Sequence, residues 1–283
     1  MSDIFDERLI YPLREKYKTY FKNYYDSIFV AFMPFFKIED EDFKEGWPTD
    51  QEIYESGTPV SWNTVIKGAG LKDEKELNKA LVTSYGAPRH VFQRDDLFEK
   101  LLAFEEDQNI WRPKEDSFGI FSKISIYESL KFLGKNDVLF TDHNLETQPT
   151  SLNDCTSLEF SEETRHCKVI YSADKDILFT IYWDQPFFLI ATSKSNLDVI
   201  LKQGLFEGFV CNDETDGLWD YEKEELAKLF EEDKIWQQEM LKYRNAGVFN
   251  KSKPSHSAVP SSDQSTKPAP LPKDWWKFWK GLF

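Results

Sequence analysis

The stretch from residue 168 to residue 221, called the central stretch below, constrains the fold most strongly. Three short apolar runs, at 169–171, 177–183 and 187–192, are separated by turns around Asp174 and Pro186. Apolar runs of this length, rich in branched and aromatic residues and bounded by turn residues, are typical of β-strands joined as a meander. Both faces of these strands are rather apolar, so we interpret the central stretch as the core of the fold.

The central stretch continues with a helix and a fourth strand. Ser193 or Ser195 is placed to cap a helix that Gly204 ends, and the run 206–211 is again apolar. Residues 222–243 then show apolar positions at helical spacing among many charges, which predicts a long amphipathic helix.

The chain before residue 134 reads as mostly helical. Apolar spacing and capping residues predict helices within 3–24 and 120–133, and within three further segments, which are 49–70, 73–86 and 93–105. Residues 27–38 read as one buried strand, which Pro34 limits. Later, 138–141 and 157–160 read as strands, the second at a sheet edge, and 142–154 reads as a loop.

These elements predict an α+β fold with a helical N-terminal half packed on a mostly antiparallel sheet. Residues 1–249 are expected to form a single domain or two packed halves, 1–134 and 135–249. Residues 250–274 are rich in Ser, Pro and Lys with almost no large apolar side chain, which is typical of a disordered linker. Residues 275–283 follow as a short aromatic and basic tail.

The charge of the chain is strongly asymmetric. The net charge is −15, and residues 250–283 hold six lysines against two aspartates, so residues 1–249 carry −19. An acidic body repels phosphate backbones, so nucleic-acid binding is not expected. The same charge suits a basic protein partner or a divalent cation, although solubility alone also explains it.

Cysteine usage and the N-terminus indicate a cytoplasmic protein. Cys155, Cys167 and Cys211 are odd in number and form no CxxC pair, so neither a disulfide framework nor a zinc knuckle is indicated. The first residues are charged and lack the apolar run of a signal peptide, and no window of about 18 apolar residues occurs.

The tail 275–283 is the most unusual local feature. Six of its nine residues are large and apolar, and two are lysines. Three roles stay open: weak contact with a membrane surface, docking on a protein partner, or packing on its own body. The side chains expected to make the contact are Trp275, Trp276, Lys277, Phe278, Trp279 and Lys280.

Candidate binding residues gather at strand ends in the central stretch. Carboxylates at such positions, when they share one rim, can bind Mg²⁺ or Ca²⁺ or supply a general acid and base. The segment 212–217 does not match a calcium-binding EF-hand loop in its spacing. The candidate binding residues are Trp183, Asp184, Glu207, Asp213 and Glu214.

Motifs for common catalytic chemistry are missing. The chain has no GxSxG, GxxxxGK[ST] or GxGxxG, and its four histidines form no HExxH set. His166 and Cys167 are adjacent, and adjacent side chains on a strand face opposite ways, which argues against a dyad. We therefore assign no catalytic residue and no metal ligand, and we expect no cofactor.

Three segments resemble an uncharacterised bacterial family, a domain of unknown function, over about residues 25–222. They are Trp47–Asp50 with Gly57–Trp62, Asp176–Phe179 with Trp183 and Asp184, and Phe206–Phe209. No activity is implied by this resemblance, and the tail lies outside it.

Two functions are therefore expected from the sequence. The first is a non-catalytic protein-binding module that, like an inhibitor or immunity protein, covers a basic surface by charge complementarity. The alternative is a divalent-cation-dependent hydrolase that uses the carboxylate rim.

Overall fold

The computed structural model of the chain describes residues 11–12, 15–38, 47–86, 89–115, 117–142 and 146–245. Residues 1–236 form one compact unit, and residues 237–283 belong to a second one. The expected linker 250–274 and tail 275–283 lie outside the described residues, as does the beginning of the helix expected over 3–24.

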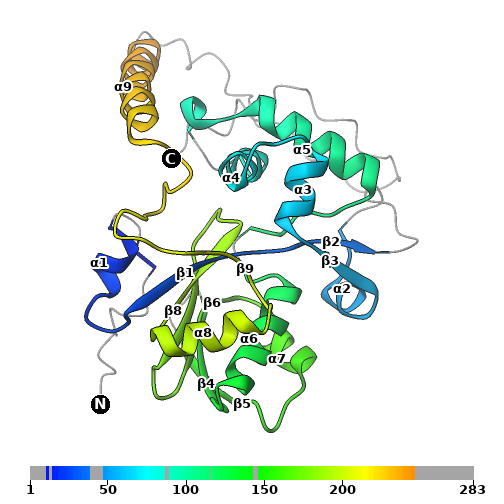
Figure 1. Cartoon of the computed structure of the whole chain (residues 1–283). Coiled ribbons are helices and arrows are strands. Elements are labelled where there is room, and N and C mark those ends of the chain that lie inside the picture. The colour runs from blue at the N-terminus through cyan, green and yellow to red at the C-terminus, as the bar shows by residue number, and fades with distance from the viewer. Residues whose placement is uncertain are drawn as a thin grey trace, which may run out of the picture. The chain divides into compact units, whose positions relative to one another are not determined.

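A seven-stranded sheet in which every pairing is antiparallel is the centre of the first unit (Figure 1). Its strand order is β5-β4-β6-β7-β8-β1-β9. Strands β6, β7 and β8 are neighbours in that order, so the predicted meander is confirmed. The strands are β1 (Ser27–Phe32), β4 (Asp137–Asp142), β5 (Thr147–Ser151), β6 (Cys167–Ser172), β7 (Ile177–Ile181), β8 (Phe187–Thr192) and β9 (Glu207–Val210).

The sheet also includes β1, a strand from the N-terminal half of the chain. Strand β1 lies between β8 and β9, and Phe29 is paired with Ile190 on one side and Val210 on the other. All six residues of β1 are buried. The side chains on both faces of β1 are apolar, and an inner strand is covered on both faces more completely than a strand at the sheet edge. The inner position of β1 agrees with this pattern.

Side chains that alternate along the strands form two cores on opposite faces of the sheet. In β8, Phe187 and Leu189 belong to one core, whereas Phe188 and Ile190 belong to the other. The first core includes side chains of α1 (Tyr17–Phe21), α3 (Trp62–Gly68), α4 (Glu74–Ser84) and α5 (Asp95–Gln108). The second includes side chains of α6 (Ile120–Phe132), α7 (Ser157–Glu163) and α8 (Lys194–Lys202), which lie together in Figure 1.

Several helix starts form as the capping residues predict. Thr49 and Glu52 make a capping box at α2 (Asp50–Ser56), and Ser61 and Asp73 cap α3 and α4. Ser193 caps α8, since its hydroxyl accepts from the backbone N–H of Asn196. The expected long helix is α9 (Lys223–Asn245), and a short 3₁₀ turn, His90–Phe92, precedes α5.

The single strand expected over 27–38 is in fact two strands. Pro34 lies between β1 and β2 (Phe35–Ile38), and β2 leaves the large sheet to pair with β3 (Gly57–Val60). Proline has no N–H for a ladder and is therefore placed at a strand boundary.

Two other predictions near residue 150 are wrong. Residues 157–160 are the first turn of α7 rather than an edge strand, because Thr156 and Glu159 form a second capping box. Part of the expected loop 142–154 is the edge strand β5, which tolerates Pro149 because only one of its edges is paired, with β4.

None of the described helices combines the length and the apolar composition that crossing a bilayer requires.

Candidate functional site

Glu207 lies at the start of β9 and binds the first turn of α3. Its carboxylate accepts hydrogen bonds from the backbone N–H groups of Trp62, at 2.6 Å, and Asn63, at 3.0 Å. The first N–H groups of a helix have no partner within the helix, so this carboxylate supplies one from a distant strand. Glu207 therefore holds α3 against the edge of the sheet.

Asp213 and Glu214 lie in the loop after β9 and form ion pairs with lysines. Lys18 Nζ is 2.9 Å from Asp213, and Glu214 lies 2.8 Å from both Lys16 and Lys223. These hydrogen bonds from Lys16 and Lys223 lower the pKa of Glu214 to about 2. The loop thus connects the segment of α1 with the start of α9.

Trp183 and Asp184 lie in the turn between β7 and β8. The indole of Trp183 is half exposed, and Lys168 Nζ lies 4.6 Å from its ring centre. Asp184 has a φ of 60°, a left-handed conformation that suits a tight turn and that aspartate adopts more readily than most residues.

The sheet register separates the five predicted residues. Phe32 is paired with both Phe187 and Glu207, so Glu207 is at the sheet end where the β7–β8 turn lies. Asp213 and Glu214 follow Val210, at the opposite end of the short strand β9. Trp183, Asp184 and Glu207 therefore share one end, and the five residues do not form a single rim.

No cation site is formed by the side chains that the structure describes. Within these ranges, no group of three or more His, Cys, Asp or Glu residues is arranged to hold a metal ion. The carboxylates of Glu207, Asp213 and Glu214 are already bound by backbone amides or lysines.

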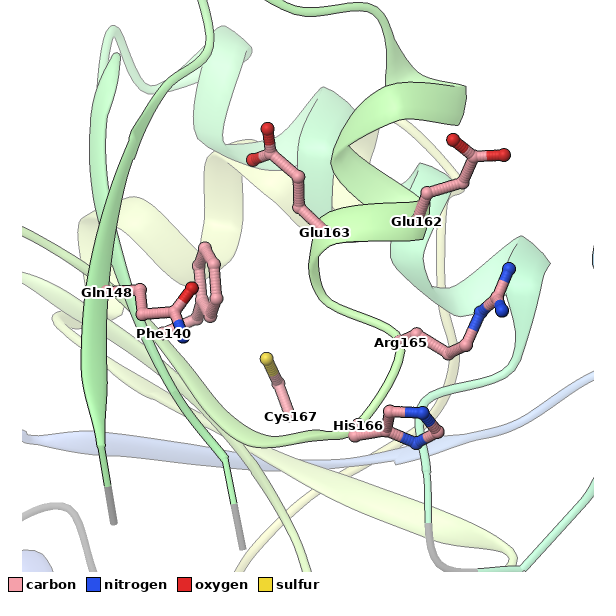
Figure 2. A pocket seen from close by; sticks show the side chains of 7 residues that line it. All are labelled: Phe140, Gln148, Glu162, Glu163, Arg165, His166 and Cys167. Carbon is pink, nitrogen blue, oxygen red and sulfur yellow. The ribbon is translucent and has the colours of Figure 1, made fainter. Parts of the chain in front are cut away.

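A cavity of about 350 Å³ lies elsewhere, between α7 and the β4–β5–β6 side of the sheet (Figure 2). In Figure 2 the thiol of Cys167 points into the cavity, whereas the ring of His166 points away from that thiol. This agrees with the argument against a Cys–His dyad. The lining residues are Phe140, Gln148, Glu162, Glu163, Arg165, His166 and Cys167.

A cluster of cations, called the basic cluster below, adjoins this cavity. It consists of Lys123 and Arg165 around the carboxylate of Asp50, together with Lys114, which lies near enough to interact electrostatically with that carboxylate. Lys123 Nζ and Arg165 Nε each lie 3.9 Å from Asp50 Oδ2. Arg165 belongs to both the cluster and the cavity wall, so the two features are continuous.

Lys123 is the unusual member of the basic cluster, because its side chain is only 2% exposed. Its ammonium donates a hydrogen bond of 3.0 Å to the backbone carbonyl of Ser161. Burial lowers the pKa of Lys123 to about 8, although the charge of Asp50 opposes this shift. Lys114 is exposed, and its Nζ lies 4.8 Å from the ring centre of Trp47.

Sequence reasoning missed the basic cluster, although one signal was present. Ile120, Ile126 and Leu130 form the buried stripe of α6, and Lys123 occupies the same stripe at a spacing of three residues. A lysine in the middle of an apolar stripe is rarely buried without a specific partner. Arg165 reaches the basic cluster because of the path that the chain takes between α7 and β6. No local sequence pattern predicts that path.

A family model and one curated relative match most of the chain. YwbB of Bacillus subtilis (strain 168), described as an uncharacterized protein, is 24% identical over 204 residues, which cover 69% of this chain and 90% of that protein. No solved structure matches the chain. The DUF2711 family, described as a protein of unknown function, matches residues 14–221. This match confirms the family resemblance expected over about 25–222, and the chain belongs to the DUF2711 family.

Proposed function

We propose that the protein is a non-catalytic binding protein whose acidic surface contacts a basic protein partner. The observation that carries this proposal is the composition of the exposed face of α5. Five carboxylates are exposed along this helix of 14 residues, and one exposed lysine, Lys100, accompanies them. The exposed carboxylates are Asp95, Asp96, Glu99, Glu106 and Asp107.

The position of these charges supports a role in association more than a role in folding. Leu97 and Leu101 face the core, so the apolar side of α5 is used by the fold while the acidic side meets solvent. Asp95 and Asp96 stabilise the first turn of α5, but the like charges that follow on the same face repel one another and do not stabilise the helix. The negative electrostatic potential of such a face accelerates association with a positively charged surface and favours partners that carry one.

The test compares two variants whose net charge changes equally. The α5 variant carries Glu99→Gln, Glu106→Gln and Asp107→Asn, which leaves the two aspartates of the first helical turn in place. The control variant neutralises three exposed carboxylates on other elements. It carries Glu55→Gln, Asp154→Asn and Asp198→Asn.

Tagged full-length protein is used for capture from an extract of the producing organism, and retained proteins are identified by mass spectrometry. We expect the wild type and the control to retain a basic protein that about 300 mM salt releases, and the α5 variant to lose it. Equal retention by all three proteins would contradict a role of this face.

The alternative, a hydrolase that uses a divalent cation, has no specific observation in its favour, since Glu207 is separated from Asp213 and Glu214 and all three carboxylates are already bound. A thermal-shift series with Mg²⁺, Ca²⁺ and Mn²⁺ tests it directly. The binding proposal expects no metal-specific rise in Tm, whereas a rise with one cation would favour the hydrolase.

A further inference from the structure

The buried ammonium of Lys123 lacks the hydrogen bonds that a buried charge requires. Within the described part of the chain it donates one hydrogen bond, to Ser161, although a lysine ammonium has three donors. Its ion pair with Asp50, at 3.9 Å, is too long to be a hydrogen bond. Buried charges are normally paired and fully hydrogen-bonded, because desolvation otherwise costs several kcal/mol.

The basic cluster also has an excess of positive charge. Among the described residues, Lys123 and Arg165 share one ion-pair partner, the carboxylate of Asp50, and Lys114 interacts electrostatically with the same carboxylate. The whole chain has a net charge of −15, so a local group of three cations is unusual for this protein. In addition, the hydroxyl oxygen of Ser161 is buried without a hydrogen-bond partner among these residues.

The adjoining cavity offers space for a ligand beside these cations. Its volume of about 350 Å³ lies in the range of sites for small molecules. Arg165 and His166 belong to its lining, with side chains that are directed away from Cys167 in Figure 2, and Gln148 adds an amide that can donate or accept hydrogen bonds. Arg165 is more than half exposed and Lys114 is exposed, so both side chains are long enough and free enough to turn toward a bound group.

We propose that the basic cluster and the adjoining cavity bind a small molecule through one anionic group, a carboxylate or a phosphate. Arg165 and Lys114 donate to that group, and Lys123 supplies a fixed positive charge from below the surface. The carboxylates of Glu162 and Glu163 on the cavity wall repel any anion, and they repel a ligand with several negative charges more strongly than one with a single charge. This site is independent of the acidic face of α5.

The first experiment measures binding of three probes to the full-length protein by isothermal titration calorimetry. The probes are acetate, inorganic phosphate and citrate, at pH 7 and constant ionic strength maintained with chloride. We expect saturable binding of acetate or phosphate, and weaker binding of citrate because of the two glutamates. The preferred probe shows whether the group is a carboxylate or a phosphate. Absence of saturable binding of both acetate and phosphate overturns the proposal.

Two matched variants test the assignment of residues. Lys114→Gln with Arg165→Gln removes two exposed cations of the cluster, and Lys100→Gln with Lys202→Gln removes two exposed cations elsewhere. We expect the first pair to weaken binding at least tenfold, because hydrogen bonds to charged groups contribute this much. The second pair is expected to bind like the wild type. Equal weakening in both pairs would show a general charge effect and overturn the site.

The dependence of affinity on pH tests the part played by Lys123. Its surroundings contain Asp50, Cys167, Arg165 and Lys114 as charged or titratable groups. Because anion binding requires the protonated amine, we expect affinity to fall as pH rises from 7 to 9. Lys123→Met, which keeps a long apolar stem in the helix, should bind more weakly at pH 7 and lose most of this pH dependence. An unchanged pH profile in that variant contradicts the role of Lys123, and circular dichroism verifies that it is folded.

Discussion

The side chain of Asp220 is almost completely buried and forms an incomplete pair with Asn78. Asn78 Nδ2 donates to Asp220 Oδ2 at 2.9 Å, whereas the buried amide oxygen of Asn78 has no hydrogen-bond partner among the described residues. Burial raises the pKa of Asp220 to about 6, and the hydrogen bond from Asn78 and the charge of Lys79 oppose this shift. A protonated carboxyl has an O–H that can donate to the unpartnered amide oxygen.

We predict that Asp220→Asn stabilises the protein at pH 8. The folded-state pKa lies above the unfolded value of 3.8, so the contribution of Asp220 is fully present below pH 3.8 and is lost as pH rises through about 6. An amide is neutral throughout and can make both hydrogen bonds with Asn78. The free energy of unfolding, measured by urea denaturation, should rise by about 1–3 kcal/mol at pH 8, and this gain should shrink as pH falls below about 6 and disappear below pH 3.8.

A neighbouring exposed carboxylate provides the control for Asp220. Glu222 is 71% exposed and pairs with Lys75, whose hydrogen bond lowers its pKa. Glu222→Gln should therefore leave stability almost unchanged at pH 8, since exposed pairs contribute little. The explanation for Asp220 fails if Asp220→Asn has the same pH dependence of stability as the wild type.

At the scale of elements, strand β9 depends on a glycine. Gly208 lies opposite Ala31 of β1 with a φ of 151°, and a Cβ atom there would lie 1.9 Å from the carbonyl oxygen of Val30. That atom belongs to the backbone of a buried central strand, so it cannot move away easily. The close approach of β9 to β1 therefore requires the absence of a side chain.

We predict that Gly208→Ala lowers the free energy of unfolding by about 3 kcal/mol or more, because β9 must move away from β1. Gly217→Ala is the control, since a Cβ there would lie 3.7 Å from the hydroxyl of Tyr17, an ordinary contact. The control should change stability by less than about 1 kcal/mol. Similar effects of the two substitutions on chemical denaturation would rule out the close approach as the cause.

At the scale of the whole molecule, the acidic body and the basic aromatic tail are expected to act together. The tail carries Lys277 and Lys280 among large apolar side chains, while residues 1–249 carry a charge of −19. A segment tethered to a binding domain acts at a high effective concentration, so even weak contacts add to affinity. We propose that the tail contacts the same partner as the body.

Deletion of residues 275–283 is predicted to lower the amount of partner captured by the tagged protein. It should leave co-sedimentation with anionic liposomes unchanged, because nine residues are few for an interfacial anchor. A fall in co-sedimentation on deletion would favour the membrane role instead. Unchanged capture and unchanged co-sedimentation together would leave packing on its own body as the role of the tail.

How much was predictable depends on the range of the interactions that determine each feature. The capping box of Thr49 and Glu52, the cap at Ser193 and the β6–β7–β8 meander involve residues close in sequence, so local patterns indicated them. Residues 157–160 were misread because four residues in which apolar Leu158 and Phe160 alternate with polar side chains fit a strand as well as a helix. There the hydrogen bonds of Thr156 and Glu159 favour the helix.

The sequence by itself determined the α+β class, the apolar strands and the charge of the body, because these follow from local periodicity and composition. Only the tertiary structure decided that β1 lies between β8 and β9, more than 150 residues away along the chain. It also separated Glu207 from Asp213 and brought Asp50, Lys123 and Arg165 together. Such contacts depend on how the whole core packs, and strand pairing between distant segments has no local signature.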